Sequence, residues 1–468
     1  MVVAVVLVAE QAGTGLAAAQ TGIAQARDAK DAGSSASTGA PAGTTLAPPA
    51  ADQLRANAPY GPSLPRDLPP VARPDERPPG IAPALFQAVE SATSDYPGIA
   101  SRKAAARASA LDVRAAKSQR LPSLGVQGVA LGTGRGLGSQ IVVDQPLFSF
   151  GRIGSNIERA KAQRVVREAE VDESVRSIAL DTISAYFDIA RLAERAVILQ
   201  STVDEQRQLV DSIGRRVEQE VSPLVDLELA RSRLAQGQQE LALTLSQRDA
   251  ALARLEQLVG NTRIDLGFVP TYDAVAHHPD PANAVEQAIA CSPQRDRLIA
   301  EASVARAEAR QAKAAILPQL SAQFSYNNII GPRAGLGVSA QTQGGLGGFQ
   351  NASAARLRQS SAEITITTAE RELRERVRTD LVENAAAKAR IESSASATLS
   401  TQNVTESFKR QYLAGRRTWL DVMNAVREAS AARLGESDAR FSAMASSARL
   451  LINTCRWQPQ ARQAETLR

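Results

Sequence analysis

The sequence is short of the side chains that most enzymes use for catalysis or for holding a metal. Its 468 residues include only two histidines, adjacent at His277 and His278, and only two cysteines. No cluster of cysteine or acidic ligands surrounds the histidine pair in the sequence, so an exposed linker pair is favoured over a metal site. A glycine-rich phosphate loop of the Walker type is also missing. The sequence therefore predicts a protein that is not an enzyme and that needs no cofactor or metal.

The two cysteines, Cys291 and Cys455, lack the spacing of metal ligands and lie far apart in the chain. If the chain is duplicated, as argued below, both lie at the outer ends of the second copy, where a disulfide is conceivable. Because a disulfide requires strict geometry, two separate small thiols are the prediction.

Aromatic residues make up only 4% of the chain, and alanine supplies much of its 44% hydrophobic content. This composition is typical of long helices packed through small side chains rather than of a thick globular core. The formal charge is +5, but the 54 basic residues are interleaved with 49 acidic ones and form no basic run. Nucleic-acid binding is not expected, because basic patches with interleaved aromatics are its usual footprint.

The front of the chain has little that could fold. The apolar run at residues 2–9 is too short to span a bilayer. Residues 1–26 resemble a secretory signal that ends in the A-x-A site Ala24-Gln25-Ala26, although no Lys or Arg precedes the run. Either the printed start lies inside a longer signal, or the segment is not a signal. Twelve of the 23 prolines fall between Pro41 and Pro83, so residues 27–80 are predicted to be a disordered spacer.

The remainder of the chain repeats itself with a shift of about 195 residues. Pro97 recurs as Pro293 and Leu121-Pro122 as Leu317-Pro318, both shifted by 196. Further matches, shifted by 195, are Val225-Asp226-Leu227 with Leu420-Asp421-Val422, and Arg254-Leu255 with Arg449-Leu450. Anchors in nearly constant register indicate a duplicated structural unit. We therefore divide the chain into a first repeat (81–268), a linker (269–282), a second repeat (283–456) and a tail (457–468).

Each repeat is predicted to contain a helix, two strands and a long helical hairpin. In the first repeat, apolar spacing predicts one helix from Pro83 to about Arg120, then alternating strands on either side of a glycine-rich turn at 132–138. A proline-free helix from about Gly154 to Val217 and a second helix after Pro223 form the hairpin. In the second repeat we expect a helix at 284–316, a strand at 320–326, a poorly defined strand within 336–348, and helices at 352–410 and 419–453.

Two segments resemble the outer membrane factor family, whose best-known member is TolC. Gln145-Pro146-Leu147-Phe148-Ser149-Phe150-Gly151-Arg152 is similar to the proline-Leu-Phe strand end of that family. The segment from Tyr412 to Val422, with sequence YLAGRRTWLDV, is similar to the family's periplasmic helix tip. The resemblance implies a mainly α protein with a membrane β-barrel part. Duplicated coiled-coil hairpins would form an α-barrel, and four strands per subunit would complete a twelve-stranded barrel in a trimer.

The resemblance also implies sites. The gate at the closed tunnel end would comprise Asp226, Tyr412, Arg417 and Asp421, with Asn424 where the family has a second aspartate. The hairpin tips that contact a periplasmic adaptor would include Pro223, Leu224, Gly415, Arg416 and Thr418, and Phe148 and Phe150 would lie at the barrel rim. The alternatives are solvated charges at helix ends and ordinary packing of the two phenylalanines.

The function that follows is a passive channel in the outer membrane, extending into the periplasm. Its partners would be two further copies of the chain, a periplasmic adaptor, an inner-membrane transporter and outer-membrane lipid. Type I protein secretion and multidrug efflux use similar ducts, and secretion is slightly preferred. The alternative is a periplasmic adaptor or coiled-coil scaffold without a barrel, but a scaffold has no use for two alternating strands between long helices.

Overall fold

The computed structural model describes residues 77–130, 137–260, 270–273, 281–327, 331–340 and 347–459. All of them belong to one unit, Leu64–Arg468. The signal-like segment, the predicted spacer up to residue 76, most of the first glycine-rich turn, His277, His278 and residues 460–468 lie outside the described residues. The domain boundaries proposed from the sequence stay a prediction.

The same order of elements occurs twice, as the repeat predicted. The first set consists of α1 (Pro83–Asp95), α2 (Pro97–Ser118), β1 (Ser123–Ala130), β2 (Leu137–Phe148), α3 (Arg152–Glu218) and α4 (Leu224–Val259). The second set consists of α5 (Ala284–Ala290), α6 (Pro293–Ala314), β3 (Gln319–Asn327), β4 (Gly331–Ser339), α7 (Gly347–Leu413) and α8 (Trp419–Asn453). The long helices α3 and α7 each contain 67 residues, a length of roughly 100 Å.

Prolines correct the predicted elements in both repeats. The helix expected from Pro83 to Arg120 is two helices, since Tyr96 before Pro97 is extended (φ −63°, ψ 123°). The helix expected at 284–316 is likewise divided before Pro293, where Ser292 caps α6 by accepting a hydrogen bond from the Arg295 amide. A proline ring disfavours helical geometry in the residue before it and suits a first helical turn. The fourth strand is also earlier than expected, at Gly331–Ser339.

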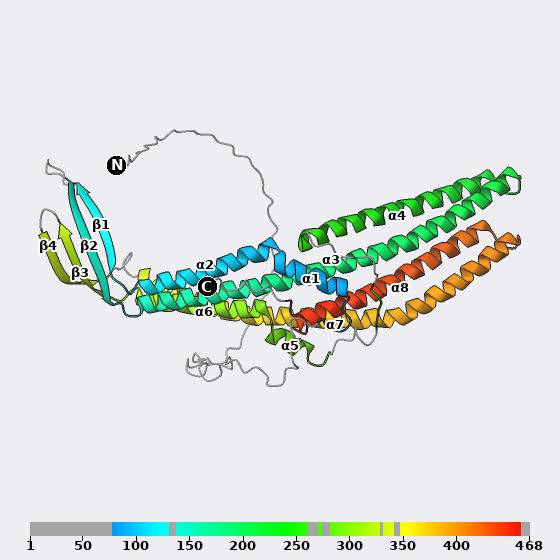
Figure 1. Ribbon diagram of the computed structural model, residues 1–468. Helices are drawn as coiled ribbons and strands as arrows, with labels where there is room; N and C mark the ends of the chain where they lie inside the picture. The colour runs from blue at the N-terminus through cyan, green and yellow to red at the C-terminus, as the bar shows by residue number, and fades with distance from the viewer. Residues whose placement is uncertain are drawn as a thin grey trace, which may run out of the picture. The chain divides into compact units, whose positions relative to one another are not determined.

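The four strands form one antiparallel sheet in the order β1-β2-β3-β4. The central pairing joins the two repeats, with Ile141 of β2 opposite Tyr326 of β3. The strands β1 and β4 are the two edges of the sheet. Figure 1 shows the sheet at one end of the long helices, with the turns between α3 and α4 and between α7 and α8 at the other.

One face of the sheet is apolar and exposed, which confirms the predicted alternation. Cross-strand rows align Leu124 with Val143 and Phe324, and Val126 with Ile141 and Tyr326. All of these side chains except the half-buried Val143 are exposed, as are Leu336 and Val338 on β4. The opposite face is more polar: Asp144 accepts hydrogen bonds there from Ser321 Oγ at 3.1 Å and Gln323 Nε2 at 2.8 Å.

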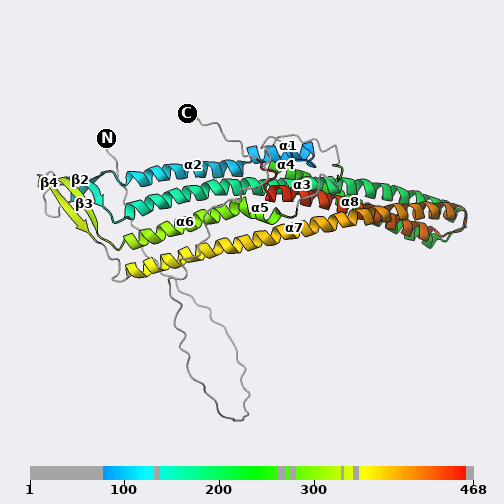
Figure 2. The same cartoon turned by 90° about the horizontal axis from the view of Figure 1, so that it is seen from below.

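The helices form a single layer whose members change along its length. Near the sheet the order is α2-α3-α6-α7, and beyond the middle it is α4-α3-α8-α7. Figure 2 shows the first order most clearly and Figure 1 the second. The edge helices are therefore α7 on one side and α2 or α4 on the other. Among the described residues, no helix is both long enough and apolar enough to cross a membrane.

The layer is held together by small side chains and a few buried polar contacts. Thr202 of α3 donates a hydrogen bond to Ser430 of α8 at 2.9 Å, and Asn384 of α7 donates to Ser446 and Ser447 of α8 at 2.8 and 3.0 Å. The larger apolar residues gather where α1 crosses α3 and α8, in a cluster that includes Leu85, Ile183, Tyr186, Phe187, Phe441, Met444 and Trp457. The expectation of helices packed closely through small side chains is thus confirmed.

The prediction that the cysteines are separate thiols is wrong. Cys291, at the end of α5, and Cys455, just after α8, form a disulfide with Cα atoms 6.3 Å apart. Arg176 of α3 lies against it and donates to the Cys291 carbonyl at 2.7 Å and to Cys455 Sγ at 2.9 Å. Burial lowers the pKa of Arg176 to about 10, while Asp296 and Asp172 favour its charged form, so it stays protonated at neutral pH.

Replacing Cys291 and Cys455 together with serine should lower the stability of the middle of the layer. The bridge joins residues separated by 164 positions, for which the chain-entropy model gives an upper bound of roughly 5 kcal/mol. The measurement is the midpoint of thermal unfolding with and without a reductant. Reductant should lower the midpoint of the parent protein and leave that of the serine variant unchanged. Equal midpoints in all four conditions would show that the disulfide contributes nothing.

Candidate functional site at the hairpin turns

The turns that end the two hairpins have the same backbone structure at equivalent positions. In the α3–α4 turn the Glu220 amide donates to Val217 O and the Val221 amide to Arg216 O. In the α7–α8 turn the Gly415 amide donates to Tyr412 O and the Arg416 amide to Gln411 O, each 195 residues later. The residue with positive φ is Glu220 in the first turn (57°) and Gly415 in the second (71°). Glycine adopts this conformation without strain, and a helix C-terminus commonly needs it.

One apolar cluster packs the two turns together. It contains Leu209, Val210, Ile213, Leu227, Ala230, Tyr412, Trp419, Val422, Met423 and Val426. Arg216 of the first hairpin stacks over the ring of Tyr412 in the second, with its guanidinium carbon 5.4 Å from the ring centroid. The first-repeat and second-repeat candidates therefore belong to one structural site.

Three of the predicted gate residues lie at the α7–α8 turn: Tyr412 at the end of α7, Arg417 between the helices and Asp421 at the start of α8. Arg417 stacks over the ring of Phe408 at 4.2 Å and donates to Gln411 Oε1 at 3.3 Å. Its distance to the Asp421 carboxylate is 3.8 Å, at the long end for an ion pair. Tyr412 is buried, and its hydroxyl has no hydrogen-bond partner among the described residues. The turn therefore brings together the side chains of Tyr412, Arg417 and Asp421, as the resemblance implied.

The two equivalent aspartates differ in what their carboxylates do. Asp421 accepts hydrogen bonds from the Thr418 amide and hydroxyl, and the Thr418 hydroxyl accepts one from the Asp421 amide. This capping box satisfies two of the backbone amides at the start of α8, those of Thr418 and Asp421. The first repeat has Pro223 where the second has Thr418, and α4 has no side-chain cap. Asp226 therefore keeps a half-buried carboxylate without an ion-pair or hydrogen-bond partner among the described residues.

The remaining tip residues are placed on the surface. Asn424 is exposed on α8, one helical turn after Asp421. All five residues predicted to contact an adaptor are exposed around the two turns: Pro223, Leu224, Gly415, Arg416 and Thr418. Large apolar side chains are open beside them, including Val221, Val225 and Leu413. The structure gives these residues a shared location, and their contact with an adaptor stays a prediction.

Phe148 and Phe150 lie where β2 passes into α3, as the sequence predicted. Their rings meet edge to face with centroids 4.6 Å apart, and both are about half exposed. Phe150 has positive φ (46°), followed by Gly151 (87°), so the chain turns sharply from strand to helix. Their role at a barrel rim stays a prediction.

Sequence reasoning missed Arg216, Trp419 and the ion pairs just above the tips. Trp419 is one of only two tryptophans, a signal that could have marked it as a packing anchor. Lys409 lies 3.0 Å from Glu205 on α3 and 3.1 Å from Glu406. Burial alone would lower the pKa of Lys409, but hydrogen bonds to these two carboxylates outweigh it, and the pKa is raised. This contact fastens α7 to α3.

The comparison with protein families agrees with this architecture. Residues 88–261 match the family model described as outer membrane efflux protein. This match lies within the first repeat and covers most of it. Among curated proteins, none matches the chain.

The chain is similar in fold to several solved structures, and each match covers most of both chains. They include the CmeC outer membrane channel of Campylobacter jejuni, with 14% identity, 81% of this chain and 87% of that chain covered, and a TM-score of 0.67. The outer membrane protein VceC of Vibrio cholerae is 16% identical, with 80% of this chain and 97% of that chain covered and a TM-score of 0.67. The MtrE outer membrane channel of Neisseria gonorrhoeae, in its open state, is 15% identical, with 81% of this chain and 90% of that chain covered and a TM-score of 0.67. The likeness confirms the predicted fold and the resemblance to outer membrane factors.

Substituting Thr418 with alanine should loosen the start of α8. The loss of an N-cap side chain costs about 1 kcal/mol, which corresponds to roughly fivefold faster opening of the first turn. Amide hydrogen exchange of residues 419–422 measures this opening. The first turn of α4, which has no side-chain cap, serves as the internal control. Unchanged exchange at 419–422 would mean that packing of Trp419 alone fixes this turn.

Proposed function

We propose that three copies of the chain form a passive efflux duct in the outer membrane that continues into the periplasm. The observation that carries the proposal is the four-stranded sheet with one exposed apolar face and two open edges. Unpaired strand edges are not tolerated in lipid, because each free backbone group costs several kcal/mol there. Pairing β1 of one copy with β4 of the next removes every edge once the ring closes.

The helical layer supports the same assembly. It ends in α7 on one side and in α2 or α4 on the other. Exposed apolar residues lie along these edge helices, among them Leu243 on α4 and Leu357, Ile364 and Leu399 on α7. A head-to-tail contact between unlike edges generates a closed ring when the rotation fits. The helices would then enclose a tunnel beneath the barrel.

The location and partners follow from the assembly. The disulfide supports an oxidising compartment such as the periplasm. The exposed tips would contact the helical hairpins of a periplasmic adaptor, which connects the duct to an inner-membrane transporter. The match to an efflux family favours small-molecule efflux over protein secretion. The duct itself catalyses no reaction in this proposal, and a scaffold without a barrel leaves the apolar sheet face unexplained.

The gate of the duct would lie at the hairpin turns. Arg417 is half exposed. The Asp226 carboxylate does not cap its helix, because α4 has no side-chain cap. An arginine fork of one copy could thus hold the Asp226 carboxylate of the next, while Asp421 mainly stabilises its own helix. Arg417 and Asp226 would then keep neighbouring tips together, while the buried ring of Tyr412 supports the α7–α8 turn from within its own chain.

A membrane-embedded trimer is the first expected result. Outer-membrane fractions from cells expressing the full chain should give a band of about three times the subunit mass on gels without boiling. Boiling should convert that band to the monomer, and light scattering of the extracted protein should give three copies. A soluble monomer or dimer would reject the duct and bring back the scaffold alternative.

Replacing Arg417 with serine should raise the leak conductance of the purified duct in planar bilayers. Loss of one charge-assisted bond of about 1.5 kcal/mol would make opening roughly tenfold more frequent. Arg416→Ser is the matched control, since it removes the same charge from the neighbouring exposed position. Equal conductance of both variants and the parent would exclude Arg417 from the gate.

A further inference from the structure

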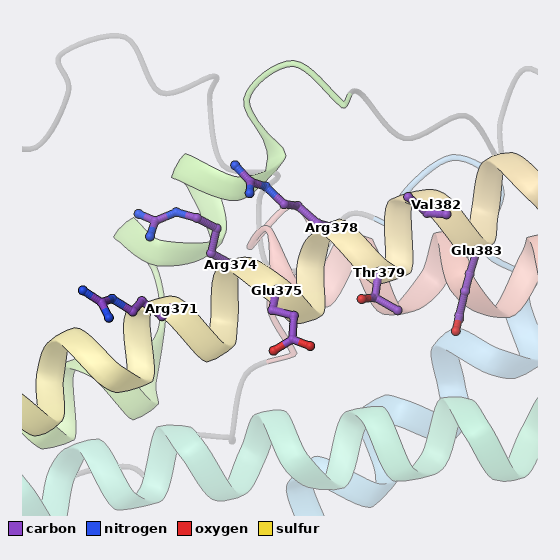
Figure 3. A pocket seen from close by; sticks show the side chains of 7 residues that line it. All are labelled: Arg371, Arg374, Glu375, Arg378, Thr379, Val382 and Glu383. Atoms are coloured by element: carbon purple, nitrogen blue, oxygen red, sulfur yellow. The ribbon is translucent and has the colours of Figure 1, made fainter. Parts of the chain in front are cut away.

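Three arginines on α7 have no ion-pair partner among the described residues. Arg371, Arg374 and Arg378 follow one another at spacings of three and four, so they share one side of the helix. Figure 3 shows all three pointing to the side on which α5 lies, whereas Glu375 and Glu383 point to the other side. We call these three residues the arginine stripe. Like charges at these spacings repel one another, so an acidic partner surface would stabilise the stripe.

The stripe lies on an edge helix. Leu373 and Val377, next to it in sequence, pack into the cluster with Leu450 of α8 and with α5. The arginines thus flank the side by which α7 joins its own chain. Together they line a shallow hollow with Glu375, Thr379, Val382 and Glu383. Val382 within this hollow is 68% exposed, so the surface is open in the single chain.

The opposite edge of the layer has a small acidic surface. Asp95 ends α1, and Glu256 lies in the last turn of α4. Both are exposed, and neither has an ion-pair partner among the described residues. A hydrogen bond from Gln257 Nε2 to the Tyr96 hydroxyl at 3.4 Å holds these two segments side by side. Asp95 and Glu256 are the sequence neighbours of these two residues, and we call the pair the acidic corner.

Ion pairs across the layer place the two surfaces at the same height. Arg295 lies 2.6 Å from Glu370, joining α6 to α7 next to the stripe. Arg297 lies 2.7 Å from Glu173, which joins α6 to α3. Arg102 near the start of α2 lies 3.7 Å from Glu170, which joins α3 to α2.

Glu370 and the start of α2 are thus level along the layer. The stripe begins at Arg371 and continues for about 10 Å toward the tips. On the opposite edge, α4 ends and α2 begins in this interval. The acidic corner lies at this junction.

We propose that the arginine stripe of one copy forms ion pairs with the acidic corner, Asp95 and Glu256, of the next copy. This inference rests on the proposed ring of copies and specifies one of its contacts. Guanidinium groups bind carboxylates in a two-pronged geometry that fixes orientation. The contact lies where the partner edge changes from α2 to α4, so it sets the axial register of neighbouring copies. Charge complementarity of this kind contributes mainly specificity.

The test is charge reversal on both sides of the contact. Arg374→Glu with Arg378→Glu should make the unboiled trimer dissociate roughly thirtyfold faster, the lower end for breaking an interfacial charge pair. Adding Asp95→Arg and Glu256→Arg to the same chain should restore the parent rate, which also shows that the variant folds. Arg376→Glu is the control: it lies on the same helix about 160° away from Arg378 and should not change the rate.

The outcomes separate this contact from the function. If the parent protein forms no trimer, the proposed duct fails, and this contact fails with it. If the parent is a trimer and the stripe variant dissociates at the parent rate, the duct stands and the contact is rejected. Failure of the charge-swapped chain to regain the parent rate, with a trimer still formed, rejects the pairing with Asp95 and Glu256 in the same way.

Discussion

The packing of α3 against its neighbours is the interaction on which the rest of the structure depends. This helix continues without a proline from Arg152 to Glu218 and is the one element that contacts α1, α2, α4, α6 and α8. Its contacts with α6 and α8 join the two repeats, and they use small side chains and short polar bonds such as Thr202 to Ser430. Since large side chains would separate the helices, the scarcity of aromatic residues follows from this close approach.

Joining the repeats through α3 leaves a layer with unlike edges. The sheet repeats the arrangement, because β2 and β3 pair across the repeats and leave β1 and β4 outside. In both the sheet and the helical layer, one edge belongs to the first repeat and the other to the second. A second copy of the chain could therefore pair with both parts in the same order. The single chain thus has unlike edges in both its helical and its strand parts, which the proposed ring of copies would pair.

The sequence predicted the order of elements well because its signals are local. Proline-free apolar periodicity gave α8 at Trp419–Asn453, and alternation gave the apolar face of the sheet. It failed at Pro97 and Pro293, where the helical period continues but the residue before proline cannot be helical. It also failed for Cys291 and Cys455. Their approach depends on the packing of α5 against α7 and α8, and the sequence around the two cysteines does not indicate that packing. For the predicted gate, the sequence pointed to Tyr412, Arg417 and Asp421, and their role stays a prediction. It did not show that Thr418 donates hydrogen bonds to the Asp421 carboxylate.

The capping box at the start of α8, which α4 lacks, shows how two copies of one structural unit can come to differ in role. Both turns keep the same backbone hydrogen bonds at a shift of 195 residues, so the equivalent aspartates begin at the same place on their helices. With Thr418 before it, Asp421 stabilises the start of α8; with Pro223 before it, Asp226 has no such bond to give up. A carboxylate that must leave a capping box to bind an arginine loses roughly 1 kcal/mol in doing so. In the proposed gate, Asp226 would bind an arginine without that loss, which makes it a better acceptor than Asp421.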